Sequence, residues 1–208
     1  MTTPHLYGLV LAGGQSRRMG RDKGLLEYHG QPHREYLYAL LARYCERVFL
    51  SLNPTQSQPD AAYFNLILDT PIYADTGPVG AVVNMVEQHP NVALFVVTCD
   101  LPFFDASCAE QLLAARDPAR AATAFLNPDI NQAEPLVTIY EAAFLRGVPA
   151  QFKAGVNSLR KLLAKADVKL ITQHTGRCIH SADLPNEFSA ANRAMQSHKP
   201  SDAPLACA

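Results

Sequence analysis

The chain has 208 residues, of which 48% are hydrophobic and 18% charged, and its formal net charge is -1. That length and composition favour one globular domain over a disordered chain. The small net charge argues against a general nucleic-acid-binding surface. The N-terminal residues lack a signal-peptide pattern, and no apolar run approaches the roughly eighteen residues of a spanning helix.

Apolar runs of strand length alternate with helical patterns along the chain. In order, the patterns predict a strand at 6–12, a helix at 32–45, strands at 47–52 and 66–69, a helix at 77–89, a strand at 92–100, a helix at 105–116, strands at 121–126 and 135–140, helices at 142–152 and 158–166, a strand at 168–172 and a helix at 184–196. This alternation predicts an α/β fold with a mostly parallel central sheet and helices on both faces. We expect one domain over residues 1–196 and a disordered tail at 197–208.

The five cysteines are scattered and none forms a Cys-x-x-Cys pair; they are Cys45, Cys99, Cys108, Cys178 and Cys207. Disulfide-stabilised and zinc-binding chains space their cysteines in recognisable patterns. We therefore expect reduced thiols in a cytoplasmic protein.

A glycine-rich basic loop follows the first predicted strand, in the stretch "LVLAGGQSRRMGRDKGLL". Ligands of open α/β sheets bind at the carboxyl ends of the strands, where this loop begins. Gly13 and Gly14 permit a sharp turn close to a ligand, and four cations follow, namely Arg17, Arg18, Arg21 and Lys23. The spacing fits neither a P-loop nor a G-x-G-x-x-G motif. We interpret the loop as a triphosphate site in preference to a solvated basic loop.

Acidic residues end two further predicted strands. Asp100 follows the strand at 92–100, where a carboxylate could bind Mg²⁺ together with substrate phosphates, while Asp105 is left to cap the next helix. Asp69 could be a ligand-binding residue or a turn former. Gly77 and Gly80, at the start of the helix at 77–89, could admit a ribose or base, or could serve close helix–sheet packing.

Four stretches occur together in one order: "LAGGQSRRMGRDKGLL", "LILDTPIYADTGPVGAV", "VVTCDLPFF" and "NQAEPLVTIY". With these motifs the chain resembles the molybdenum cofactor guanylyltransferases, over residues 7–193. The resemblance implies a Rossmann-like nucleotidyltransferase fold.

The resemblance also implies roles for individual residues. It implies a nucleotide site made of Leu11, Ala12, Gly13, Gly14, Lys23, Ser51 or Asn53, Asp69, Gly77, Pro78 and Asp100. Arg18 and Lys23 would contact the phosphates, Asp100 would bind Mg²⁺, and these three would be the catalytic residues. Glu134, Pro135, Arg160, Ser181 and Asp183 would face the acceptor. At the last two positions "HSADLPNEF" departs from an N-x-N-T-P string that is frequent in the family.

The implied reaction transfers GMP from GTP to molybdopterin, forms the guanine dinucleotide cofactor and releases pyrophosphate. Implied partners are the two substrates and molybdoenzyme chaperones or other cofactor-biosynthesis proteins, with no nucleic acid and no membrane. Two alternatives stay open from the sequence. One is a related nucleotidyltransferase that uses CTP on the pterin or an NTP on a sugar or alditol phosphate, and the other is a catalytically silent nucleotide-binding scaffold.

Overall fold

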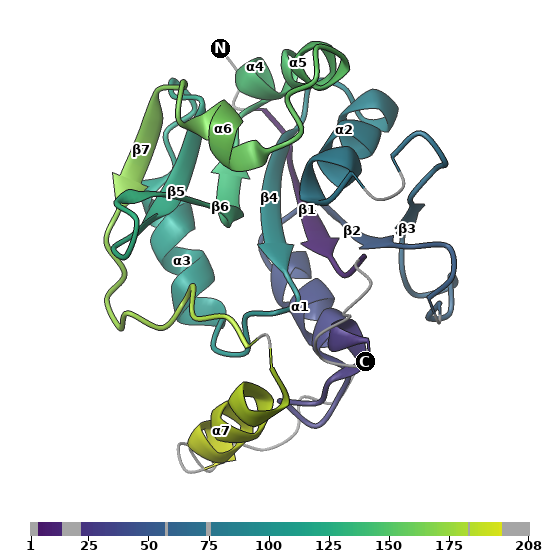
Figure 1. Ribbon diagram of the computed structural model, residues 1–208, viewed down its shortest axis with the longest axis vertical. Coiled ribbons are helices and arrows are strands. Elements are labelled where there is room, and N and C mark those ends of the chain that lie inside the picture. Colours follow the sequence, from purple (N-terminus) through teal and green to yellow (C-terminus); the bar gives the residue numbers. More distant parts are fainter. Residues whose placement is uncertain (1–3, 14–21, 57, 74–75, 183, 197–208) are drawn as a thin grey trace.

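The computed structural model describes residues 4–13, 22–56, 58–73, 76–182 and 184–196, which fold around one seven-stranded sheet. The strands are β1 (Leu6–Leu11), β2 (Arg47–Leu52), β3 (Leu66–Leu68), β4 (Ala93–Thr98), β5 (Ala122–Asn127), β6 (Gln132–Tyr140) and β7 (Val168–Ile171). Their order in the sheet is β3-β2-β1-β4-β6-β5-β7, with β3 and β7 at opposite edges (Figure 1). Only β6 runs antiparallel to its neighbours β4 and β5, so the predicted mostly parallel sheet is confirmed.

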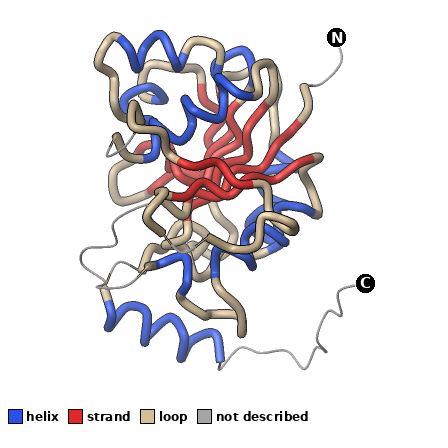
Figure 2. Tube along the Cα trace, turned by 90° about the vertical axis from the view of Figure 1, so that its right-hand side faces the viewer, coloured by secondary structure: helices blue, strands red, loops and turns tan. Residues whose placement is uncertain are grey.

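Helices cover both faces of the sheet, as Figure 2 shows in side view and as the sequence predicts. The helices are α1 (His33–Ala42), α2 (Pro78–Gln88), α3 (Ala106–Ala115), α4 (Ala142–Leu145), α5 (Val148–Lys153), α6 (Leu159–Leu163) and α7 (Pro185–Gln196). Because successive side chains of a strand point to opposite faces, Val10 packs in the cluster under α1 and α3, whereas Leu9 and Leu11 pack under α2 and α4–α6. Both faces of β1 are therefore buried.

Helix α7 lies away from the sheet, beside the segment that follows the basic loop (Figure 1). That segment begins with a short 3₁₀ helix, η1 (Lys23–Leu25). Leu26 and Tyr28 form a small apolar cluster with Ala191 of α7, and Phe188 packs against it. None of the described helices is long and apolar enough to cross a bilayer.

Two differences between the predicted elements and the structure have a clear local cause. The helix expected at 142–152 divides into α4 and α5, since Pro149 has no N–H to donate and occupies the first turn of α5. Strand β6 begins at Gln132, three residues before the predicted start, because a hairpin pairs its first residues with the end of β5.

The expectation of reduced cysteines is wrong for two of them. Cys108 of α3 and Cys178 form a disulfide with their Cα atoms 5.7 Å apart, whereas Cys45 and Cys99 are buried free thiols. The two bonded cysteines are 70 residues apart in sequence. Only the packing of the segment after β7 against α3 brings them together, and spacing alone gives no sign of that contact.

Candidate functional site

The carboxyl ends of β1, β2 and β3 bring three of the predicted nucleotide-binding residues together. A Cβ built on Gly13 would lie 3.5 Å from both the backbone N of Asn53 and Oδ2 of Asp69. Backbone bonds hold the strand ends in register, from Ala12 N to Ser51 O at 3.0 Å and from Asp69 N to Leu52 O at 3.0 Å. Gly13, Asn53 and Asp69 thus line one edge of the sheet, as expected for residues that follow neighbouring parallel strands.

Ser51 and Asn53 were alternatives for one contact position, and they lie in different surroundings. Ser51 is only 1% exposed inside the sheet, next to β1 and β3. Asn53 is half-buried where β2 ends, and its Oδ1 accepts hydrogen bonds from the backbone N and the Oγ1 of Thr55. Of the two, Asn53 is the better placed for contact with a ligand.

Asp100 lies just beyond β4, next to the end of β1. The backbone N of Cys99 donates to Leu11 O at 3.2 Å, and the carbonyl of Asp100 accepts from Ala182 N at 2.8 Å. Its side chain is half-buried. Asp105 caps α3 as predicted, by accepting from Cys108 N at 3.0 Å, so Asp100 is not needed as a helix cap.

His33 stabilises the backbone next to Asp100. This first residue of α1 is fully buried, and its Nε2 donates to Leu101 O at 3.1 Å. Burial lowers the pKa of His33 to about 3, with a smaller contribution from nearby His29. His33 is therefore neutral at physiological pH and acts in packing and positioning.

The thiol of Cys99 is influenced by two carboxylates, those of Asp100 and Asp22. Burial raises the pKa of the Cys99 thiol well above its usual value, and the negative charges of Asp100 and Asp22 raise it further. Two carboxylates from separate loops therefore act on the same buried sulfur. No cluster of three possible metal-binding side chains occurs among the described residues. One or two carboxylates are, however, what Mg²⁺ typically takes from a protein when substrate phosphates supply other ligands, so the carboxylate of Asp100 fits that ion.

The two glycines at the start of α2, Gly77 and Gly80, could serve either ligand contact or close packing, and their surroundings differ. Gly77 has φ +71°, a conformation that favours glycine, and Pro78 occupies the first helical turn. A Cβ on Gly80 would lie 2.0 Å from Oγ1 of Thr76, so Gly80 serves close packing. Asn84 Nδ2 donates to Leu68 O at 3.0 Å and fixes α2 beside β3.

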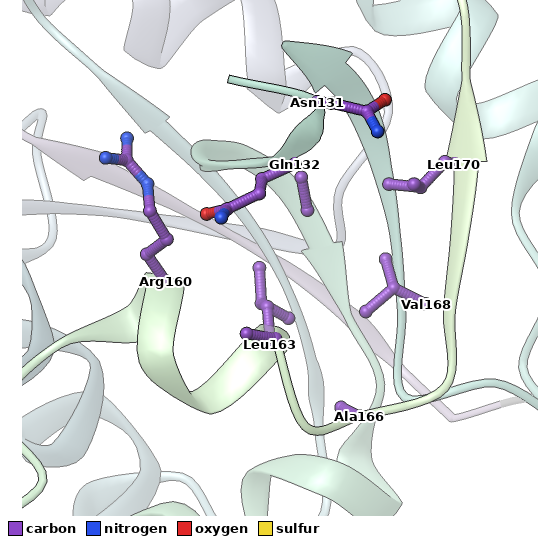
Figure 3. A pocket seen from close by; sticks show the side chains of 9 residues that line it. Asn131, Gln132, Arg160, Leu163, Ala166, Val168 and Leu170 are labelled. Carbon is purple, nitrogen blue, oxygen red and sulfur yellow. The ribbon is translucent and has the colours of Figure 1, made fainter.

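The acceptor-side candidates fall into two groups. Glu134 and Pro135 lie in a bulge of β6, because Ala124 pairs with Thr138 while Leu126 pairs with Ala133, which leaves residues 134–137 opposite one residue of β5. Arg160 of α6 lines a cavity of about 330 Å³ beside this hairpin (Figure 3). The other residues lining it are Asn131, Gln132, Ala133, Leu163, Ala164, Ala166, Val168 and Leu170. Ser181 lies instead next to Ala182, whose backbone N donates a hydrogen bond to the carbonyl of Asp100.

Three candidate residues, Gly14, Arg18 and Asp183, lie outside the described part of the chain. Lys23 is described and opens η1, directly after Asp22. Asp22 and Gln56 are two further candidates that the sequence does not predict; Nε2 of Gln56 donates to Oδ2 of Asp22 at 2.7 Å. Asp22 stands inside the basic loop motif, which could have identified it, whereas nothing in the sequence distinguishes Gln56.

The family model of the MobA-like NTP transferase domain matches residues 8–174. The chain belongs to this family. It is a nucleotidyltransferase, and its curated relatives include enzymes named molybdenum cofactor guanylyltransferase.

Two relatives of the MobA-like family illustrate the coverage. The molybdenum cofactor guanylyltransferase of Pseudomonas aeruginosa is 31% identical over 173 residues, which are 81% of this chain and 84% of that protein. The molybdenum cofactor biosynthesis bifunctional protein of Synechocystis is 35% identical over 187 residues, which are 90% of this chain and 54% of that protein. The chain therefore spans about half the length of the bifunctional relative.

Solved structures support the Rossmann-like fold of the MobA-like family. Molybdopterin-guanine dinucleotide biosynthesis protein A from Archaeoglobus fulgidus superposes with a TM-score of 0.72 at 15% identity, covering 92% of this chain and 99% of that one. A 2-C-methyl-D-erythritol 4-phosphate cytidylyltransferase from Thermus thermophilus gives a TM-score of 0.67 at 15% identity, covering 94% and 100%. At such identities the likeness concerns the fold alone.

Proposed function

We propose that the chain is a molybdenum cofactor guanylyltransferase, which transfers GMP from GTP to molybdopterin and releases pyrophosphate. The observation that carries the proposal is its 31% identity to the Pseudomonas aeruginosa enzyme of that name, over 84% of that enzyme. The convergence of Gly13, Asn53 and Asp69 at one sheet edge supports a nucleotide site there.

The chemistry requires little from a general base. The terminal phosphate of molybdopterin attacks the α-phosphorus of GTP; a new P–O bond forms there, and the bond to the β-phosphate oxygen breaks as pyrophosphate leaves. A phosphate monoester is largely ionised at neutral pH. The main task of the protein is to bring two polyanions together and stabilise the charge of the transition state.

The proposed roles follow from position. Leu11, Ala12, Gly13, Gly14, Asn53, Asp69 and the Gly77–Pro78 turn would contact the nucleotide, and Ser51 would support them. Lys23 and Arg18 would bind its phosphates as charge-assisted donors. Asp100 would hold Mg²⁺, and the ion when bound would neutralise charge on the phosphates.

The acceptor side would use residues from both of its groups. Glu134 and Pro135 would lie towards the pterin, and Arg160 is the basic candidate for its phosphate. Ser181 and Asp183 would also face the acceptor, where the family string is altered. We further propose a cytoplasmic location, where GTP is available, and delivery of the product to a molybdoenzyme, its chaperone or another cofactor-biosynthesis protein. Incubation with molybdopterin, Mg²⁺ and each NTP, with the product identified by mass, tests the proposal.

A further inference from the structure

One side chain connects the two ends of the basic loop. Gln56 lies in the turn after β2, and its Nε2 donates to Ala12 O at 2.9 Å and to Asp22 Oδ2 at 2.7 Å. Ala12 precedes the glycine pair, and Asp22 directly precedes Lys23. Ala12 and Asp22, on either side of the segment that carries Gly14 and Arg18, are therefore hydrogen-bonded to the same side-chain amide, that of Gln56.

The Gln56 side chain is itself held in place. Its Oε1 accepts from Asn53 N at 2.8 Å, and its backbone N donates to Asn53 O at 3.0 Å. The side chain is half-buried, and both N–H groups and the oxygen of its amide are used. A carboxamide is suited to this place because it offers two donors and an acceptor in one plane.

Asp22 links Gln56 to the turn that contains Lys23. Its Oδ1 accepts from Gly24 N at 2.8 Å and caps η1, which begins at Lys23, while its Oδ2 accepts from Gln56. The packing is close at this point, since a Cβ on Gly24 would lie 3.2 Å from Cδ of Arg34 and 3.4 Å from Cβ of Ala12. The orientation of the Asp22 carboxylate therefore helps to fix the turn that presents Lys23.

We infer that Gln56 is a positioning residue for GTP, which closes the basic loop by joining Ala12 to Asp22 and so fixes Lys23 for phosphate binding. The inference rests on the proposed function. Gln56 need not touch the substrate; it acts through the two loop ends. Its loss should weaken GTP binding while leaving the acceptor side, built from other elements, largely unaffected.

The substitution Gln56→Glu is nearly isosteric and removes both N–H groups that donate to Ala12 and Asp22. At neutral pH a glutamate there has no donor for Ala12 O and places a second negative charge against Asp22. We expect the KM for GTP to rise about tenfold or more, the scale of losing a hydrogen bond to a charged group. The KM for molybdopterin should change less than about twofold. Gln151→Glu, the same change at an exposed position of α5, is the matched control and should behave like the wild type.

A second variant separates the contact from a general loss of folding. In Gln56→Glu/Asp22→Asn the donor and acceptor are exchanged, so an amide at 22 can donate to the carboxylate at 56. We expect its KM for GTP to recover at least about fivefold relative to Gln56→Glu, since one charged hydrogen bond is restored. Thermal unfolding of each variant shows whether it is folded.

The outcomes distinguish this inference from the proposed function. If the wild type makes no guanine dinucleotide, the proposed function fails. If the wild type is active and Gln56→Glu keeps its KM for GTP within about twofold, the inference about Gln56 is overturned. Equal effects on both KM values, or no recovery in the double variant, would assign Gln56 a merely structural role and overturn it as well.

Discussion

Asp100 is the single residue on which the proposed metal site depends. Its backbone is held by Ala182, and the next carbonyl is held by His33, so the carboxylate projects from a fixed segment. Asp100→Asn keeps the size of the side chain and removes its charge. We expect turnover to fall about a hundredfold or more, the scale of losing one preorganised electrostatic group. Steady-state turnover at several Mg²⁺ concentrations checks this.

The control for Asp100 is Asp129→Asn, the same change at an exposed residue of the β5–β6 hairpin. It should leave turnover within about twofold of the wild type, because surface substitutions away from a site have small effects. Normal turnover in Asp100→Asn would remove Asp100 from the mechanism. Unfolding of that variant would instead indicate a structural role.

At residue scale the sequence predicts the neighbours of a strand end better than the contacts between loops. Gly13, Asn53 and Asp69 follow three different strands, and parallel pairing necessarily brings them to one edge. The link between Gln56 and Asp22 joins residues 34 apart, from loops whose conformations no periodic pattern describes. The roles of Gly14, Arg18 and Asp183 stay predictions.

At the scale of elements, the disulfide attaches the segment after β7 to α3. This segment continues to Ser181 and Ala182, and the latter is bonded to Asp100. Replacing Cys108 and Cys178 by serine should lower the free energy of unfolding by about 2–4 kcal/mol, because an unlinked chain regains loop entropy when it unfolds. Urea unfolding of the double variant and of the wild type measures the difference.

A thiol titration provides the control for the disulfide. In denaturant without reductant the wild type should show three reactive thiols, the five cysteines less the two that are bonded. After reduction it should show five. Five thiols before reduction, or equal stability of the two proteins, would contradict the cross-link.

Most elements could be predicted because apolar periodicity decides them, and β2 matches its predicted range of 47–52. The antiparallel direction of β6 relative to β4 could not be assigned. The alternation of strands and helices does not show that a hairpin strand inserts between β4 and β5. The disulfide between α3 and the segment after β7 could not be predicted either, because it depends on how that irregular segment packs. In both cases the missing information is tertiary rather than local.

For the whole molecule, the buried neutral His33 predicts a loss of stability in acid. Its pKa is about 3 in the folded chain and near 6.5 when exposed, so unfolding takes up a proton between those values. The free energy of unfolding should therefore fall as the pH drops from 6.5 towards 3, by up to about 1.4 kcal/mol per pH unit from this group. Urea unfolding at several pH values measures the slope.

The matched variant for this pH dependence is His33→Gln, which can still donate to Leu101 O but does not titrate. Its slope between pH 6 and pH 4 should be shallower than that of the wild type by about 1 kcal/mol per pH unit. His29 and the carboxylates remain in both proteins, so most of their contribution cancels in the comparison. Identical slopes would contradict a buried neutral His33.

Guanylyl transfer to molybdopterin is the central claim, and one measurement tests it most directly. The protein is incubated with molybdopterin, Mg²⁺ and an equimolar mixture of GTP, CTP, ATP and UTP, and the pterin product is identified by mass. The account predicts the guanine dinucleotide as the main product, with an equal amount of pyrophosphate, and formation about a hundredfold slower or more with Asp100→Asn. A cytosine dinucleotide as the main product, or no dinucleotide from the folded wild type, would contradict it.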